Sequence, residues 1–330
     1  MAIVLAVRHT EDGRIGALKL CHASGNRAEA EERFRREHRS LSRLQHPNIV
    51  RVYDGGIWQE HPWYVMELVE GRDLRAEVEA WEKSPPAGRW DQTRRLTTEL
   101  ARALQYIHAH GLVHRDLTPA NVMVRPDGSA ILMDFGVAKE ATPPQANEDL
   151  TAHGELLGTV AWIAPEQITG DEVDARADLY SLGALVYLMA TGRRPFHART
   201  LAGYLDKHLH RVPRPLREIV PDVPADLEEV SLRLLQKDPK DRYASATHLL
   251  QVLEGPLTTP IDLSRWPAEL VGRVGEASAL LSAVASCAEG KGGVVMIESE
   301  PGLGRSRLLK TALAAAPVLG LRTHALGARG

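Results

Sequence analysis

A polar segment in the middle of the chain restricts the fold more than any other feature. Residues 114–121 read His-Arg-Asp-Leu-Thr-Pro-Ala-Asn, so that Asp116 stands five residues before Asn121. Eighteen residues after Asp116 comes Asp134-Phe135-Gly136, directly behind a short apolar run. A lone Asp-Phe-Gly is usually an ordinary turn, whereas residues 114–121 are the strongest signal in the chain. Their order, and their position between a predicted helix and a predicted strand, make the combined signal specific.

The chain around these motifs divides into a strand-rich front and a helical back. Residues 3–8 and 15–20 predict a β-hairpin, residues 26–44 predict a helix, and residues 49–54 and 63–67 predict two short strands. Helical spacing then dominates over residues 73–81, 91–110, 174–191, 200–208, 225–236 and 245–253. A small strand-rich part followed by a large helical part predicts an α+β fold with two lobes, not a repeated βαβ pattern.

Composition restricts the class of protein and its partners. Hydrophobic residues make up 44% of the chain and charged residues 25%, which is ordinary for a globular protein. The net charge of −3 favours neither a nucleic-acid nor a membrane partner within this chain. The two cysteines lie far apart, and no apolar run reaches the ~20 residues that span a bilayer. The short apolar N-terminus does not read as a signal peptide, so we expect a cytoplasmic protein.

A lysine and a glutamate in the front part form a second candidate pair. Alternation along the strand 15–20 places Ala17 and Lys19 on the same face. An isolated lysine on a strand is most often a surface residue. Glu37, however, shares a helix face with three apolar residues, so it points inward and requires a cationic partner. We therefore predict an ion pair between Lys19 and Glu37, with a solvated Glu37 as the alternative.

Taken together, these motifs resemble bacterial Hanks-type (eukaryotic-like) serine/threonine protein kinases over residues 1–254. Further matches are Ala164-Pro165-Glu166, Asp-Leu-Tyr-Ser-Leu-Gly at residues 178–183 and Asp-Pro-Lys-Asp-Arg at residues 238–242. The resemblance implies a bilobal kinase fold and transfer of the ATP γ-phosphoryl group to protein serine or threonine hydroxyls. It also implies ATP and Mg²⁺ as cofactors and proteins as substrates.

The same resemblance assigns catalytic roles by position. Asp116 would accept the proton of the attacking hydroxyl, and Asn121 and Asp134 would hold Mg²⁺. Lys19, positioned by Glu37, would hold the α- and β-phosphates.

An adenine pocket follows from the resemblance as well. Val4 and Ala17 would cover the base on one side and Met123 on the other. Met66 matches the gatekeeper, and Glu67 and Val69 match the hinge residues whose backbone groups pair with adenine. The apolar members of this set also fit an ordinary hydrophobic core.

Two features of the helical part are expected to be structural. In the family, the equivalents of Glu166 and Arg242 form a buried ion pair, and the equivalent of Asp178 anchors the backbone of the catalytic loop. Independently, the helix 174–191 is apolar on nearly every side, as a buried central helix should be. Asp174 suits the N-cap of that helix.

The segment before the Ala-Pro-Glu motif bears on substrate choice and activation. Residues 158–167 resemble the corresponding stretch of bacterial serine/threonine kinases, in which Thr159 would contact Asp116. Arg115 would meet a phosphate on the loop 137–159, where we predict phosphorylation of Thr151 first and Thr142 second. The alternative is that both are solvated loop threonines.

Two departures from the family pattern bear on the reaction rate. The glycine-rich phosphate loop is truncated, because Ala2 stands at its third glycine; a misplaced start, a truncation or a genuine lack of phosphate cover would each explain this. Thr118 replaces the usual lysine and brings no charge to the γ-phosphate. These departures leave open a pseudokinase that binds nucleotide or a partner and regulates an attached ATPase module.

The C-terminal part predicts a different module. Residues 255–268 read as a linker, and residues 269–330 read as the incomplete start of an α/β P-loop segment. Gly302, Gly304, Arg305 and Ser306 resemble a degenerate P-loop in which arginine replaces lysine, although an ordinary βα loop is the alternative. This part resembles the entry to AAA/STAND-type ATPases, so we expect a kinase–ATPase fusion with regulatory domains beyond residue 330.

Overall fold

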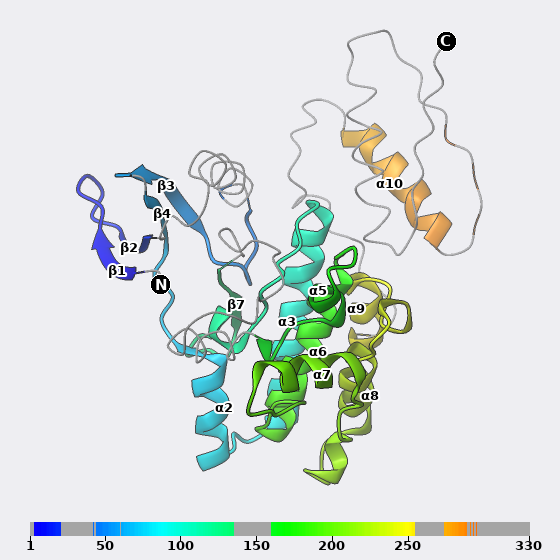
Figure 1. The fold of residues 1–330 in the computed structure, drawn as a ribbon. Helices are drawn as coiled ribbons and strands as arrows, with labels where there is room; N and C mark the ends of the chain where they lie inside the picture. The colour runs from blue at the N-terminus through cyan, green and yellow to red at the C-terminus, as the bar shows by residue number, and fades with distance from the viewer. Residues whose placement is uncertain are drawn as a thin grey trace.

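The computed structural model describes residues 3–20, 42, 44–59, 61–134, 160–254 and 274–288, together with positions 291, 293 and 295. Within these ranges the chain forms a small strand-rich lobe followed by a large helical lobe, in agreement with the predicted two-lobed α+β fold (Figure 1).

The described part of the small lobe contains an antiparallel sheet with the strand order β1-β2-β4-β3. Nearly all of the helix predicted over residues 26–44 lies outside the described residues. Strands β1 (Ile3–Arg8) and β2 (Ile15–Leu20) form the predicted hairpin, and β4 (His61–Glu67) pairs with β2 on one side and β3 (Val52–Trp58) on the other. Along β4 the side chains alternate between partly exposed and buried, as expected for a strand that covers a core with one face. β1 lies at the edge of the sheet and is largely exposed.

The strand predicted over residues 49–54 is wrong in its position, because β3 starts only at Val52. The residues ahead of it pair with the large lobe instead. The N–H of Val50 donates to the carbonyl of Leu132 at 3.0 Å, and the N–H of Leu132 donates to the carbonyl of Asn48 at 2.8 Å. The apolar pattern of this segment is therefore shared between two sheets, which spacing alone does not reveal.

The large lobe opens with a small sheet and is otherwise helical. The sheet has the order β5-β6-β7, formed by β5 (Arg72–Asp73), β6 (Val122–Val124) and β7 (Ala130–Leu132). The helices are α2 (Leu74–Lys83), α3 (Arg89–Ala109), α5 (Pro165–Thr169), α6 (Arg176–Thr191), α7 (Leu201–His210), α8 (Ala225–Leu234) and α9 (Ala246–Glu254). Three short 3₁₀ turns complete it: η1 (Pro119–Asn121), η2 (Leu216–Glu218) and η3 (Pro239–Asp241).

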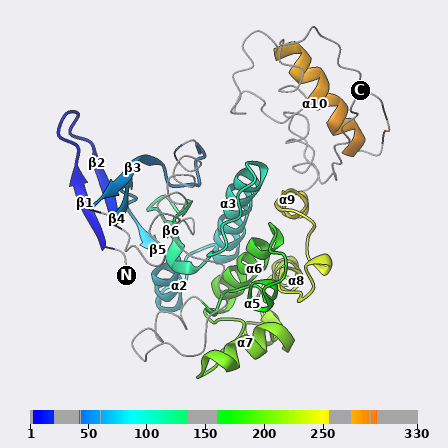
Figure 2. The same ribbon diagram turned by 45° about the horizontal axis from the view of Figure 1, so that its top comes forward.

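Helix α6 is the centre of the large lobe. Every residue from Ala177 to Thr191 is buried, which confirms the prediction of a helix that is apolar on nearly every side. α6 packs between α3 and α8 (Figures 1 and 2). The prediction that Asp174 occupies the N-cap is wrong by one position, because the helix starts later and Ala175 is its N-cap. The carboxylate of Asp174 nevertheless accepts the N–H of Arg176 at 2.8 Å, so it still satisfies one of the first amides of the helix.

Beyond residue 254, the structure describes one further helix, α10 (Val274–Ala288), within the segment expected to start an α/β module. The P-loop segment expected after it, with Gly302, Gly304, Arg305 and Ser306, lies outside the described residues. None of the helices in the described ranges combines the length and the apolarity needed to cross a membrane.

Candidate active site

The catalytic-loop candidate lies between α3 and β6, and a buried carboxylate holds its backbone. Asp178, on α6, accepts the N–H of His114 and the N–H of Arg115, both at 2.8 Å. It also accepts a hydrogen bond from Nε2 of His108 at 2.8 Å. Arg115 has a φ of +64°, a left-handed conformation that is rare for residues other than glycine. The expectation that Asp178 anchors this loop is confirmed.

The environment of Asp178 keeps it ionised. Burial favours the neutral acid, but the hydrogen bond from His108, together with the nearby His108 and His114, outweighs burial and holds the pKa of Asp178 below its usual range. A charged acceptor forms stronger hydrogen bonds to backbone amides than a neutral one does. The strained loop backbone is therefore fixed by a strong interaction from the core of the large lobe.

A glutamine provides a second support for the loop, which the sequence patterns did not suggest. Nε2 of Gln167, on α5, donates to the carbonyl of Arg115 at 2.9 Å. Oε1 of the same side chain accepts the N–H of Ala164, the residue before α5, at 3.2 Å. The peptide group of Arg115 is thus held at its N–H by Asp178 and at its carbonyl by Gln167.

Asp116 and Asn121 are in direct contact, as their five-residue spacing suggests. Nδ2 of Asn121 donates to the backbone carbonyl of Asp116 at 2.7 Å and lies 3.2 Å from its carboxylate oxygen Oδ2. Asn121 ends the 3₁₀ turn η1, whose first residue is Pro119. Proline fits this position because the first N–H of a helical turn has no partner within the turn. Thr118, which replaces the lysine of the family pattern, is buried immediately before the turn.

Backbone pairing brings Asp134 beside this loop. The N–H of Met133 donates to the carbonyl of Asn121 at 2.8 Å, and Nε2 of His114 lies 2.9 Å from the carbonyl of Met133. Asp134 follows directly and has a φ of +42°, which aspartate tolerates better than most residues. The two predicted metal ligands therefore lie on adjoining chain segments.

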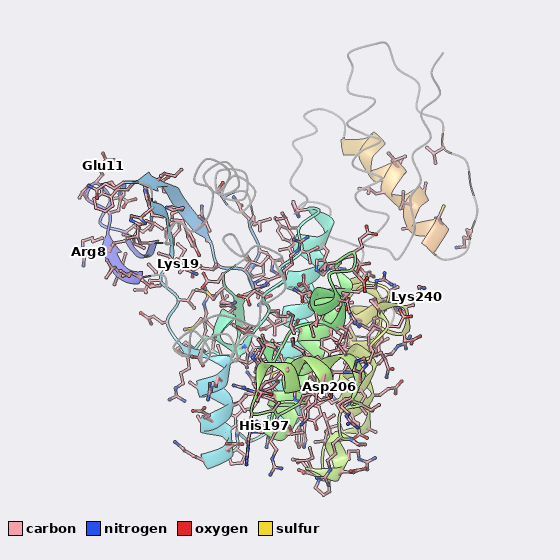
Figure 3. All side chains as sticks on the ribbon, in the orientation of Figure 1. Arg8, Glu11, Lys19, His197, Asp206 and Lys240 are labelled. Carbon is pink, nitrogen blue, oxygen red and sulfur yellow. The ribbon has the colours of Figure 1, made fainter. Side chains whose placement is uncertain are left out.

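Lys19 reaches Asp134 from the small lobe. Nζ of Lys19 lies 2.7 Å from Oδ2 of Asp134, and both side chains are partly buried. Figure 3 marks Lys19 on the strand-rich lobe. The partner predicted for Lys19, Glu37, lies outside the described residues. The predicted Lys19–Glu37 ion pair stays a prediction, whereas the Lys19–Asp134 pair was not anticipated.

A tyrosine that sequence reasoning missed completes this contact. Tyr64, on β4, donates its hydroxyl to Oδ1 of Asp134 at 2.7 Å. Its signal is in the sheet register, since Tyr64 is paired with Lys19 across β2 and β4 and opposite residues of an antiparallel pair share a face. That register could not be read from the sequence alone.

The residues expected around adenine lie on strands β1, β2, β4 and β6. Ala17 and Met66 are paired across β2 and β4, and both are buried. Val4 is paired with Lys19 and is 56% exposed. Met123, on β6, is partly buried.

The hinge candidates sit at and after the end of β4. The N–H of Glu67 donates to the carbonyl of Arg51 at 2.8 Å, so this group is not available to a base. The Glu67 carboxylate pairs with Arg125. Val69 packs against the core.

The predicted brace of the large lobe is confirmed. Arg242 donates to both carboxylate oxygens of Glu166, at 2.7 and 2.8 Å, and neither side chain is more than 5% exposed. The guanidinium also donates to the backbone carbonyls of Arg176, Gln236 and Lys237. A buried ion pair is stable only when its remaining donors are satisfied in this way.

The donor set fits the Mg²⁺ that the motifs imply. Asn121 directs its amide nitrogen to Asp116, which leaves the amide oxygen for a cation. Asp134 offers a carboxylate whose contacts are a lysine and a hydroxyl, both of them hydrogen-bond donors. Mg²⁺ prefers oxygen ligands and is usually held by one or two protein groups together with substrate phosphates. Thr159, Thr151 and Thr142 lie outside the described residues.

Comparison with known proteins agrees with this geometry. The protein kinase domain family model matches residues 1–253. Serine/threonine-protein kinase Pkn1 of Myxococcus xanthus is 38% identical over 269 residues, which cover 80% of this chain and 38% of that protein. Serine/threonine-protein kinase PknB of Mycobacterium leprae is 35% identical over 221 residues, which cover 66% of this chain and 34% of that protein. The chain thus spans well under half the length of these curated relatives.

Solved structures show the same fold. The kinase domain of Mycobacterium tuberculosis PknI superposes with a TM-score of 0.57 at 30% identity, covering 76% of this chain and 88% of that one. Rad53 in complex with AMP-PNP superposes with a TM-score of 0.61 at 27% identity, covering 76% of this chain and 60% of that one. Because the family model covers most of the chain, the chain belongs to the protein kinase family.

Proposed function

We propose that this chain transfers the γ-phosphoryl group of ATP to serine or threonine hydroxyls of proteins. One continuous set of contacts supports this proposal. Lys19 pairs with Asp134, the residue before Asp134 is hydrogen-bonded to Asn121, and Asn121 contacts Asp116. The set joins both lobes and contains a carboxylate base, oxygen ligands for a cation and a phosphate-binding ammonium, which are the parts that phosphoryl transfer requires.

In the proposed reaction, the hydroxyl oxygen of the substrate forms a bond to the γ-phosphorus while the bond from that phosphorus to the bridging oxygen of ADP breaks. Asp116 accepts the hydroxyl proton, and its contact with Asn121 holds it in place. Lys19 turns from Asp134 to the α- and β-phosphates. Mg²⁺, held by Asn121 and Asp134, would neutralise charge on the phosphates. ADP and the phosphorylated protein are released, and Asp116 returns its proton to solvent.

Several finer roles belong to the same proposal. Glu37 would position Lys19, and Thr159 would contact Asp116 beside the substrate hydroxyl. A phosphate on Thr151, or secondarily on Thr142, would order the activation loop through Arg115. Mass spectrometry of protein produced with ATP present tests the two phosphosites: phosphate on Thr151 is expected, and an unmodified loop in active enzyme contradicts it.

The C-terminal part is proposed to belong to a larger cytoplasmic regulator with an AAA/STAND-type ATPase module. The greater length of the curated relatives is consistent with further domains around such a kinase unit. The degenerate P-loop, with Arg305 in place of lysine, is not expected to hydrolyse ATP by itself.

Transfer of labelled phosphate from ATP tests the central proposal. Asp116→Asn removes the base and should lower incorporation at least ~100-fold, as should Lys19→Met. Asp91→Asn is the matched control, because the side chain of Asp91 is 88% exposed and lies outside the site; its incorporation should equal that of the unmodified chain. Incorporation that survives Asp116→Asn would come from another enzyme and would refute the proposal.

Thr118 favours a second candidate, a pseudokinase. The threonine is buried where the family has a lysine, so it supplies no charge to the transferring phosphoryl group. A pseudokinase would bind ATP or AMP-PNP and yet give no incorporation that depends on Asp116. Thr118→Lys separates the candidates, since a slow enzyme should become faster, whereas a pseudokinase should stay silent.

A further inference from the structure

Tyr64 contacts both Lys19 and Asp134, the two members of an ion pair between the lobes. Its hydroxyl is 2.7 Å from Oδ1 of Asp134, while Nζ of Lys19 lies 2.7 Å from the other oxygen, Oδ2. The same ammonium stands 5.8 Å from the centre of the Tyr64 ring. The carboxylate of Asp134 is therefore held on one oxygen by a neutral donor and on the other by a cation.

The place of Tyr64 in the sheet makes this contact a fixed one. Tyr64 is only 6% exposed, whereas its neighbours on β4, Trp63 and Val65, are partly exposed on the opposite face. Tyr64 is paired with Lys19 of β2, and two residues further along β4, Met66 is paired with Ala17. A buried phenol needs a hydrogen-bond partner, and a ring packed in a sheet has little freedom to choose another. The Tyr64 hydroxyl therefore fixes the position of Oδ1 of Asp134.

The two donors differ in what they are free to do. Lys19 has a long flexible side chain, and under the function proposed above it leaves Asp134 for the nucleotide phosphates. Tyr64 is anchored by its strand and stays. Asp134 also has a left-handed backbone, with φ at +42°, so its orientation depends on its side-chain contacts.

We infer that Tyr64 is a positioning residue for the metal ligand Asp134: it keeps the carboxylate oriented for Mg²⁺ after Lys19 has moved to the phosphates. This inference rests on the proposed function for the role of Mg²⁺ but concerns a residue that the family motifs do not include. Groups hydrogen-bonded to a metal ligand orient it, and their loss commonly lowers metal affinity tenfold or more.

Tyr64→Phe tests the inference because it keeps the ring and removes only the hydroxyl. Binding of AMP-PNP to the full chain is measured by calorimetry, once with EDTA and once across a Mg²⁺ titration. We expect unchanged affinity in EDTA and about a tenfold higher half-saturating Mg²⁺ concentration. Tyr53→Phe, on the neighbouring strand β3, is the matched control and should leave the Mg²⁺ dependence unchanged. Equal losses with and without Mg²⁺, or no change at all, would overturn the inference.

A double variant separates positioning from a general effect on the fold. If Tyr64 acts through Asp134, then Tyr64→Phe should add nothing to the loss of Mg²⁺ dependence caused by Asp134→Asn. Additive losses would mean that Tyr64 acts elsewhere. This readout is independent of phosphoryl transfer, so the positioning role can fail while the kinase activity stands, and the activity can fail while nucleotide binding still reports on Tyr64.

Discussion

Two carboxylates of the large lobe, Asp178 and Asp134, illustrate two ways of holding a charge. The side chain of Asp178 is 1% exposed and accepts hydrogen bonds from two backbone amides and a histidine of its own lobe. The side chain of Asp134 is 29% exposed, and its side-chain partners within the described residues, Lys19 and Tyr64, come from the other lobe. The first arrangement fixes a backbone, whereas the second can exchange a partner, as a metal and a nucleotide require.

The same contrast separates the two ion pairs. Lys19–Asp134 and Glu166–Arg242 each have an N–O distance of 2.7 Å. The second pair is almost fully buried, and its guanidinium also donates to backbone carbonyls, while the first pair is partly exposed. Equal distance therefore does not mean equal energetic weight, because desolvation and the number of satisfied donors decide what the loss of one partner costs. The following experiments test whether buried contacts inside the large lobe contribute more to stability than the partly exposed Lys19–Asp134 pair.

The largest effect is expected for Glu166→Ala. It leaves the buried guanidinium of Arg242 without its carboxylate, which should lower the free energy of unfolding by about 3–5 kcal/mol. Glu79→Ala is the matched control, since Glu79 also pairs with an arginine but is 58% exposed; its cost should stay below about 0.5 kcal/mol.

Urea unfolding followed by circular dichroism measures both. Lys19→Met, which removes the ammonium from the Lys19–Asp134 pair, should lower the free energy of unfolding by less than about 1 kcal/mol. If Lys19→Met lowered the free energy of unfolding as much as Glu166→Ala, the two ion pairs would not differ in their contribution to stability.

Core packing should separate the lobes next. Leu182, on α6, is fully buried, so Leu182→Ala should destabilise by about 2–5 kcal/mol through lost burial and a cavity. Leu5, on the edge strand β1, is 53% exposed, and Leu5→Ala should change stability by no more than about 0.5 kcal/mol. Thermal unfolding of the two variants checks this. Similar losses at both positions would mean that β1 is covered in the protein as it exists in solution.

The pH dependence of stability tests a buried histidine of the large lobe, His208. Burial, with the charge of Lys237, lowers the pKa of His208 to about 3, well below its unfolded value near 6.5. Between these values the unfolded chain binds a proton that the folded chain refuses, so this contribution to stability falls as the pH drops from about 6.5 toward 3.

His208→Gln removes the titrating group while keeping a polar partner for Tyr180. The loss of stability from pH 7 to pH 5 should shrink by up to about 2 kcal/mol in this variant. Urea midpoints at the two pH values measure it, and an identical pH dependence in both proteins would count against a refused proton on His208.

The smallest effect is expected at Gln167, whose side chain supports the catalytic loop. Gln167→Ala removes the hydrogen bond to the carbonyl of Arg115 and the one from the N–H of Ala164. Only the first reaches the catalytic loop, and since it is worth about 1 kcal/mol, kcat should fall roughly fivefold. Gln92→Ala is the matched control because Nε2 of Gln92 makes the same kind of bond, to the carbonyl of Gly128. Both variants should lose similar stability, but only Gln167→Ala should slow transfer. Equal rates in the two variants would show that this support does not reach the reaction.

Much of the site could be predicted from short segments. Asp116 and Asn121 are five residues apart on one turn, and Asp178 carries a motif of its own, so their roles depend on local spacing and residue type. The buried helix α6 was also predictable, because its apolar residues cover every side. Boundaries were less certain. Asp174 missed the N-cap by one residue, and the backbones of Asn48 and Val50 pair with Leu132 of the other lobe, since local pattern does not say which sheet a short apolar run joins.

By itself, the sequence determined the order of the motifs and the two-lobed architecture, and it allowed a base and metal ligands to be predicted, because each motif is written within a continuous stretch of chain. Only the tertiary structure decided that Lys19 pairs with Asp134, that Tyr64 holds the other oxygen and that Gln167 supports Arg115. These contacts join segments far apart in the chain. Their existence depends on strand register and on the packing of one lobe against the other, which residue spacing does not encode.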